Sequence, residues 1–130
     1  MHLRNCRIVL SVTLFTCLFS MVKINALAQE IRAVNKEEKK VLTLVLALPE
    51  VQEKVKLIRQ LGNGKSQLSL NVSALPDIYI PYYQVNVINP APSYKILYQF
   101  AVDPKTYQIY YYDPIKNHQY TLADWRKMRK

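Results

Sequence analysis

The chain has 130 residues, with 18 Lys and Arg against 9 Asp and Glu, and only two cysteines. Both cysteines, Cys6 and Cys17, fall within the first 28 residues. The rest of the chain therefore has no disulfide, no thiol nucleophile and no cysteine ligand for zinc. Its length is enough for one domain with a hydrophobic core.

Residues 1–28 have the pattern of a secretory signal peptide. Arg4 and Arg7 precede an apolar run over residues 8–22, and Ala26-Leu27-Ala28 supplies the small residues that a signal peptidase requires. The run is short for a bilayer span, which takes about 20 apolar residues, and an uncleaved anchor helix is the alternative. We therefore expect an exported protein, periplasmic or secreted, with no transmembrane segment after cleavage.

We predict that the mature chain begins at Gln29 and that residues 29–130 form a single domain. Without Arg4, Arg7 and Lys23, 15 basic residues face 9 acidic ones, so the mature chain has a net charge of +6. Mass spectrometry of the exported protein should find Gln29 at the N-terminus. Intact residues 1–28 would favour an anchor instead.

Two helical segments joined at Pro49 are expected after the leader. Asn35 is a good N-cap, and Glu38 stands at the capping-box position. Because proline pushes the preceding residue out of the α region, the helix ends or kinks near Leu48, and Gly62 ends the second segment. Helical spacing predicts that the inward side chains are Val41, Leu42, Leu44, Val45, Leu48, Val51, Val55, Ile58 and Leu61.

Four strands are expected next. Residues 67–73 alternate between apolar and polar side chains, residues 78–89 read as a second strand, and residues 93–113 read as a hairpin around Asp103-Pro104-Lys105-Thr106. With these four residues as the loop, paired positions sum to 209, and Val102 faces Tyr107. The predicted core face carries Leu68, Leu70, Val72, Tyr83, Val85, Val87, Ile96, Tyr98, Phe100, Val102, Tyr107, Ile109 and Tyr111.

The two ends of the domain complete the expected fold. Residues 29–34 read as a short lead-in and residues 116–119 as a polar loop. Thr121 caps a last short helix, which Trp125 docks on the domain. The predicted fold class is α+β, with a kinked N-terminal helix packed on a four-stranded antiparallel meander sheet and a short C-terminal helix.

Part of this pattern resembles a known family. The strand Tyr82-Tyr83-Gln84-Val85-Asn86-Val87 follows a helix and precedes the hairpin Val102-Asp103-Pro104-Lys105-Thr106, which is similar to the PepSY-type pattern. The resemblance covers residues 49–113. It implies a cystatin-like domain of an exported bacterial protein that binds or restrains partners, peptidases included. The family pattern has glycine where Tyr107 stands, and the 209 pairing predicts that Tyr107 is an ordinary strand residue.

The mature chain shows no set of residues typical of an active site. Its one histidine, His118, falls in a predicted polar loop and reads as a solvated side chain. The acidic residues are scattered, several of them on first helical turns, where they complement the helix dipole. We therefore expect no enzyme, no metal site and no cofactor. Export also makes nucleic acid a poor candidate partner.

The unusual feature is tyrosine, since all ten tyrosines lie between Tyr79 and Tyr120. Alternation along the strands sends some of them to the outer face of the sheet, where tyrosine combines apolar area with a polar group. A protein or peptide partner is expected there, with a glycan or another subunit as further candidates. The alternative is that tyrosines are simply good strand formers. The predicted binding residues are Tyr82, Lys95, Gln99, Tyr110 and Tyr112.

Four basic residues crowd the C-terminus, namely Arg126, Lys127, Arg129 and Lys130. They support an alternative function, an accessory envelope protein held by this tail to an anionic polymer or lipid. A merely solvated tail is the simpler interpretation. Salt distinguishes the two functions, because binding through the tail weakens with ionic strength and binding through the tyrosine face does not.

Overall fold

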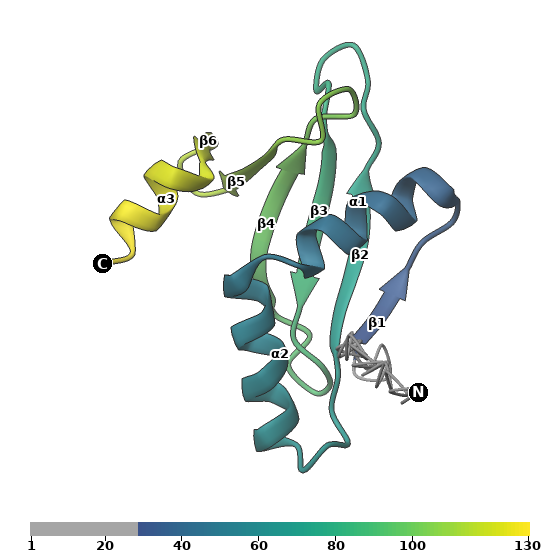
Figure 1. Cartoon of the computed structure of the whole chain (residues 1–130), viewed down its shortest axis with the longest axis vertical. Coiled ribbons are helices and arrows are strands. Elements are labelled where there is room, and N and C mark those ends of the chain that lie inside the picture. The colour runs from purple at the N-terminus through teal and green to yellow at the C-terminus, as the bar shows by residue number, and fades with distance from the viewer. Residues whose placement is uncertain (1–28) are drawn as a thin grey trace, which may run out of the picture.

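The computed structural model describes residues 29–130, so the predicted signal peptide lies outside the described residues. The fold is α+β, as predicted, with three helices and one six-stranded mixed sheet whose strand order follows the chain. The elements are β1 Gln29–Arg32, α1 Lys36–Leu46, α2 Pro49–Leu61, β2 Leu68–Ala74, β3 Tyr83–Ile88, β4 Ile96–Val102, β5 Ile109–Asp113, β6 His118–Thr121 and α3 Leu122–Met128. In Figure 1, α1 and α2 lie in front of one face of the sheet.

The predicted kinked helix is two separate helices. The Asn35 side chain accepts a hydrogen bond from the Glu38 backbone N–H, and the Glu38 carboxylate accepts one from the Val34 N–H, both at 2.9 Å. These bonds satisfy backbone donors at the start of α1. Leu48 is extended, with ψ 136, and Pro49 begins α2 at a position where a missing N–H costs no helical hydrogen bond.

Neither edge strand of the sheet is among the four strands predicted from the sequence. The predicted lead-in contains β1, which pairs in parallel with β2, so the sheet is mixed rather than an antiparallel meander. The predicted polar loop runs into β6, which pairs with β5 and sets Tyr120 opposite Tyr111. Each edge strand has four residues and hydrogen bonds to one neighbour only, which is too short for the alternation on which strand prediction rests.

The second predicted strand is too long, because β3 begins at Tyr83 rather than at residue 78. The Asp77 carboxylate accepts hydrogen bonds from the N–H groups of Tyr79 at 2.8 Å and Ile80 at 2.7 Å. A turn backed by its own side chain thus replaces strand pairing in this segment, the 75–82 loop. The exposed large side chains of the loop are Leu75, Ile78, Tyr79 and Ile80.

The β4–β5 hairpin is shifted by two residues from the predicted register. Val102 pairs with Ile109, so paired positions sum to 211 rather than 209. The turn is longer because Tyr107 is left-handed, with φ 59, and its N–H donates to the Asp103 carbonyl at 2.8 Å. The prediction that Tyr107 is a strand residue is therefore wrong. Since side chains alternate with a period of two, a shift of two leaves each paired residue on its predicted face.

Glycine and alanine at position 107 separate backbone strain from loss of the ring. Both changes remove a ring that packs on the core and lies 3.8 Å from the Lys40 Nζ. A left-handed Cβ costs about 1–2 kcal/mol, offset by about 0.4–1 kcal/mol of unfolded-state entropy for glycine. We expect Tyr107→Gly to be more stable than Tyr107→Ala by about 0.5–1 kcal/mol in urea melts. The opposite order would contradict the left-handed turn.

The core lies between the helices and one face of the sheet. Trp125 stacks on Tyr111, with ring centroids 4.5 Å apart and planes 8° apart. It also meets Phe100 and Tyr98 edge-on, at 5.6 and 5.5 Å. The short helix α3 is thus docked by Trp125, as predicted, on the same face as α1 and α2. The largest fully buried side chains are Phe100, Leu42, Leu68 and Leu70.

Three residues predicted to face the core do not join it, namely Leu44, Leu61 and Ile96. Leu61 is the last residue of α2 and is exposed. At the start of β4 the register shifts, because Ile88 pairs with Ile96 while Val87 pairs with Tyr98. This bulge sends Leu97, predicted on the outer face, against the core cluster instead.

Candidate functional site

The outer face of the sheet lies opposite the core. Along each strand, the residues that pack with the helices alternate with residues that point to this outer face. All three helices pack on the core side, so no described helix covers the outer face (Figure 1). On β2 to β6 the outer-face residues include Ser69, Asn71, Gln84, Asn86, Ile88, Gln99, Ala101, Tyr110, Tyr112 and Gln119.

Polar side chains form a row that crosses the whole outer face, one from each strand. Each member is the register partner of the next, from β1 to β6. Neighbouring strands lie about 4.8 Å apart, so the row extends for about 24 Å. We call it the polar row, and its members in order are Arg32, Asn71, Asn86, Gln99, Tyr112 and Gln119.

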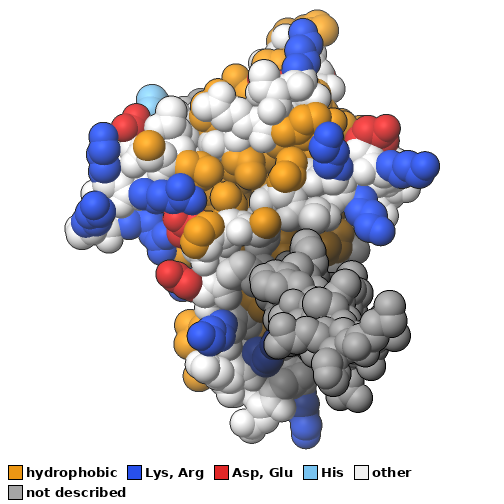
Figure 2. All heavy atoms as spheres, viewed as in Figure 1, with side chains coloured by type: hydrophobic (Ala, Val, Ile, Leu, Met, Phe, Trp, Pro, Cys, Tyr) orange, Lys and Arg blue, Asp and Glu red, His pale blue; other side chains and the backbone are white. Residues whose placement is uncertain are grey.

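Five of the six strands that build this face are almost free of charge, whereas the sixth, β1, contains Glu30 and Arg32. From β2 to β6 they contain one charged residue, Asp113, whose carboxylate accepts hydrogen bonds from the N–H groups of Ile115 and Lys116 in the next turn. In contrast, Figure 2 shows Lys and Arg side chains spread over the helix-covered face. Exposed protein surface usually carries many charged side chains. The part of the outer face formed by β2 to β6 has few of them and is suited to recognition by neutral hydrogen bonds.

The hydrogen bonds within the polar row are incomplete. Gln99 Nε2 donates to Asn86 Oδ1 at 3.1 Å, and the Tyr112 hydroxyl donates to Asn117 Oδ1 at 2.8 Å. Asn71 Oδ1 is buried and has no hydrogen-bond partner among the described residues. A buried acceptor without a partner costs about 1–3 kcal/mol. The middle of the row is therefore held in place, while the Asn71 amide keeps unused hydrogen-bonding capacity.

Four of the five predicted binding residues share this face. The rings of Tyr82 and Tyr110 meet edge-on, with centroids 5.8 Å apart, and Gln99 pairs with Tyr112 across β4 and β5. Lys95 stands apart from them. It precedes β4 at the β3–β4 turn, whereas Tyr110 pairs near the other end of β4.

Two hollows border the outer face, and the sequence gives no signal for either because loops line them. The larger has a volume of about 500 Å³, and its lining includes Arg32, Lys65, Ser69 and Asn89. Because Arg32 belongs to the polar row, this hollow opens at one end of the row. The smaller, of about 340 Å³, lies between the 75–82 loop and the β4–β5 turn, and Tyr82 lines it.

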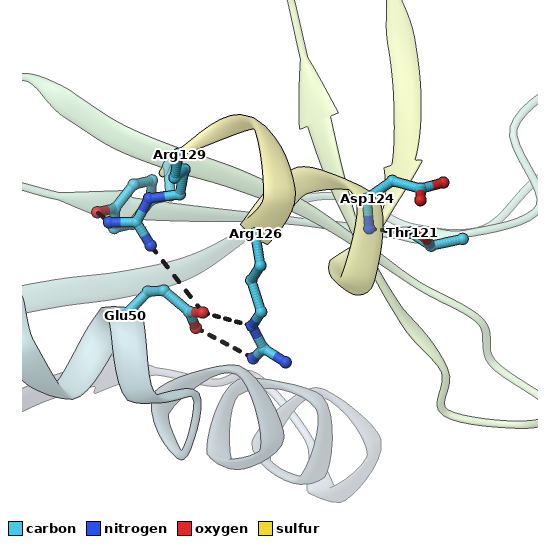
Figure 3. Close-up of polar contacts among 6 residues, drawn as sticks. Glu50, Thr121, Asp124, Arg126 and Arg129 are labelled. Carbon is cyan, nitrogen blue, oxygen red and sulfur yellow. Dashed lines mark hydrogen bonds and ion pairs between the residues drawn. The ribbon is translucent and has the colours of Figure 1, made fainter.

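Two of the four C-terminal basic residues make internal contacts. Arg126 donates two hydrogen bonds to the Glu50 carboxylate, from Nε to Oε1 and from Nη2 to Oε2, the second at 3.2 Å (Figure 3). Arg129 Nη1 lies 3.9 Å from Glu50 Oε1, and the Arg129 guanidinium lies 4.8 Å from the Trp125 ring centroid. We call Glu50, Arg126 and Arg129 the Glu50 latch, because they tie α3 to α2.

The Glu50 latch shifts the pKa of the Glu50 carboxyl group. The Glu50 side chain is only 8% exposed, yet the hydrogen bond from Arg126 lowers the Glu50 pKa below its usual 4.5, against the effect of burial. The other two basic residues are exposed, and Lys127 lies 3.9 Å from the exposed Asp124. The structure thus divides the predicted basic tail into a latch and two surface lysines.

Within residues 29–130, no group of three His, Cys, Asp or Glu side chains is arranged to hold a metal ion. The helices of this part of the chain include none that is long and apolar enough to cross a bilayer. His118, predicted in a loop, begins the edge strand β6 and contacts the Tyr120 ring at 4.3 Å.

Comparisons of the chain with protein-family models, with curated proteins and with solved structures gave no match. The resemblance to PepSY-type domains stays a prediction.

Proposed function

We propose that this protein is an exported, non-catalytic binding module whose recognition surface is the outer face of the sheet. The observation that carries the proposal is the polar row, a line of hydrogen-bonding side chains that is uncharged from β2 to β6 and that the three helices leave open. Export itself rests on the predicted signal peptide.

The geometry of the row favours an extended partner. A row of about 24 Å is longer than a small metabolite and suits a chain-like ligand. Apart from the exposed Arg32, its side chains are half-buried, and Gln99 is already bonded to Asn86. Groups fixed in this way lose little conformational entropy when a ligand binds, which favours affinity.

A second candidate function, restraint of a peptidase, is favoured by the 75–82 loop. Ile78 and Tyr79 are 89% and 85% exposed at its tip, and the Asp77 turn holds their backbone. A rigid, protruding apolar tip suits insertion into a partner's cleft, and large exposed apolar groups mark interaction sites. If the protein restrains a peptidase, the double change Ile78→Ser with Tyr79→Ser should abolish inhibition of the peptidase. Substitutions on the outer face of the sheet should not.

The Glu50 latch weakens the proposal that a basic tail attaches the protein to the envelope. Arg126 and Arg129 are engaged with Glu50 and with the ring of Trp125, which gives them a structural role. Attachment through the tail would therefore depend mainly on Lys127 and Lys130.

The test is capture of partners from an envelope extract by residues 29–130. Tyr110→Ser with Tyr112→Ser should reduce capture about tenfold, because it removes two rings from the outer face. Lys127→Ser with Lys130→Ser is the matched control on α3 and should have no effect. Capture should also persist between about 0.05 and 0.5 M salt.

Two results would contradict the proposal. One is unchanged capture by the tyrosine variant, provided that its urea midpoint shows it to be folded. The other is capture that disappears in high salt and in the lysine variant, which would favour the basic tail.

A further inference from the structure

We infer that the 75–82 loop is a membrane-contact site, whose tip enters the interfacial layer of a lipid bilayer. The loop is a different surface from the outer face of the sheet, so this inference does not rest on the proposed function. Three features of the loop support it, namely its exposed apolar side chains, its internally paired backbone and its place at one end of the sheet.

The loop gathers exposed apolar side chains in one short segment. Of the six residues from 75 to 80, four are large, apolar and exposed, namely Leu75, Ile78, Tyr79 and Ile80. Single exposed apolar residues are common on protein surfaces, whereas a cluster of them marks an interaction site. Figure 2 shows hydrophobic side chains, with Lys or Arg beside them, at the end of the molecule where this loop lies in Figure 1.

The backbone of the loop is prepared for a medium with little water. Pro76 and Pro81 have no N–H group, and the Asp77 N–H donates to the Ile80 carbonyl at 2.9 Å. The N–H groups of Tyr79 and Ile80 donate to the Asp77 carboxylate. Because an unpaired backbone donor is costly to bury away from water, this pairing lowers the cost of placing the tip among lipid head groups.

The side chains around the tip also suit the boundary between lipid and water. Tyrosine is enriched at membrane interfaces, where its ring is apolar and its hydroxyl stays wet, and Tyr79 and Tyr82 both belong to the loop. Lys105 of the β4–β5 turn lines the hollow beside the loop, but so do Asp77 and Asp103. This end of the molecule therefore has no excess of positive charge in that hollow, and we expect apolar insertion rather than charge attraction to drive binding.

The position of the loop allows the contact. It joins β2 to β3 and lies beside the β4–β5 turn, since neighbouring strands run antiparallel, and it extends past the end of the sheet (Figure 1). A protruding tip can reach a flat bilayer before the rest of the domain does. The strands would then point toward the membrane, and the outer face would stay open to its partner.

A protein cleft fits the loop less well than lipid does. A partner that binds an extended segment pairs with the backbone groups of that segment. At this tip the N–H groups of Tyr79 and Ile80 already bond to Asp77. A lipid interface makes no such demand, because it needs only apolar area and paired backbone groups.

Sedimentation of residues 29–130 with phosphatidylcholine vesicles tests the inference. We expect reversible binding with a midpoint on the order of 1 mM lipid, since a few apolar side chains anchor a protein weakly. Ile78→Ser with Tyr79→Ser should weaken binding at least about tenfold. Ile115→Ser with Tyr94→Ser is the matched control, because these residues are exposed in turns at the other end of the sheet, and should leave binding unchanged.

An inserted probe completes the test. Tyr79→Trp should show a blue shift of its emission on vesicle binding and quenching by lipids brominated in their acyl chains. Lys127→Trp, at an exposed position on α3, should show neither change, and the buried Trp125 is common to both variants. The loss caused by the double serine change should also persist at about 0.5 M salt and with phosphatidylglycerol in the vesicles.

Four results would overturn the inference. They are no vesicle binding by the parent, equal binding by the folded double serine variant, binding that disappears in high salt, and an unquenched Trp at position 79. A parent that inhibits a peptidase through this loop and binds no vesicles would favour the protein cleft instead. Capture through the outer face is measured separately, so a failure of vesicle binding leaves the proposed function standing and a failure of capture leaves this inference standing.

Discussion

Phe100→Ala is expected to lower the free energy of unfolding by about 3–5 kcal/mol. Phe100 is 1% exposed and is surrounded by three rings, with centroid distances of 5.8 Å to Tyr98, 6.1 Å to Tyr111 and 5.6 Å to Trp125. Truncation removes a large buried side chain and leaves a cavity whose rigid aromatic walls cannot close it. Urea melts of the variant and the parent measure the loss.

Two further variants calibrate this result. Ile58→Ala truncates the buried face of α2 and should cost about 2–5 kcal/mol. Tyr79→Ala removes a ring that is almost fully exposed and should change stability by less than about 0.5 kcal/mol. A Phe100→Ala loss as small as that of Tyr79→Ala would mean that the sheet does not pack on the helices in this register.

Arg126→Met is expected to destabilise the fold by about 1–3 kcal/mol. Methionine keeps the apolar stem but leaves the buried Glu50 carboxylate without its two hydrogen bonds from Arg126, with Arg129 still nearby. We expect a smaller loss of stability than for a fully buried ion pair, because the Arg126 side chain is 42% exposed. Lys127→Met is the matched control on α3 and should cost less than about 0.5 kcal/mol, since its partner is exposed.

The pH dependence of the stability loss caused by Arg126→Met tests the latch independently of how large that loss is. In the folded parent the Glu50 pKa is lowered from 4.5, so its stabilising contribution is complete above that value and is lost as pH falls through the folded pKa. The difference in unfolding free energy between parent and variant should therefore be full near pH 7 and shrink in acid below about pH 4. Other acids titrate in both proteins and cancel. A difference that persists at low pH would contradict the latch.

The sequence predicts most of the core because burial follows local periodicity. The α1 and α2 stripes and the alternation in β2, β3 and β4 do not depend on which strands pair. The hairpin shows the limit of this reasoning, since Asp103 and the left-handed Tyr107 lengthen the turn and shift the register by two residues. The faces are nevertheless predicted correctly, because an even shift preserves alternation.

The sequence predicts the placement of the outer-face residues better than it predicts the contacts of the C-terminal basic residues. The alternation of side chains along each strand is enough to place four predicted residues on one face, namely Tyr82, Gln99, Tyr110 and Tyr112. Prediction of the polar row would require the register of all six strands, and two of these are short edge strands without a sequence signal. The Glu50–Arg126 contact joins residues 76 positions apart, and a local pattern contains no information about such a pair.

The side-chain NH₂ signals of the four amides in the polar row test the central claim most directly. In a ¹⁵N-labelled domain titrated with the ligand that the parent captures, these signals belong to Asn71, Asn86, Gln99 and Gln119. The recognition surface proposed here predicts that they shift together at the lowest ligand concentrations, while the backbone signals of Leu42 and Val45 in the buried face of α1 stay in place. Ligand binding that moves signals of α3 or of the 75–82 loop and leaves these four amides unchanged would contradict it.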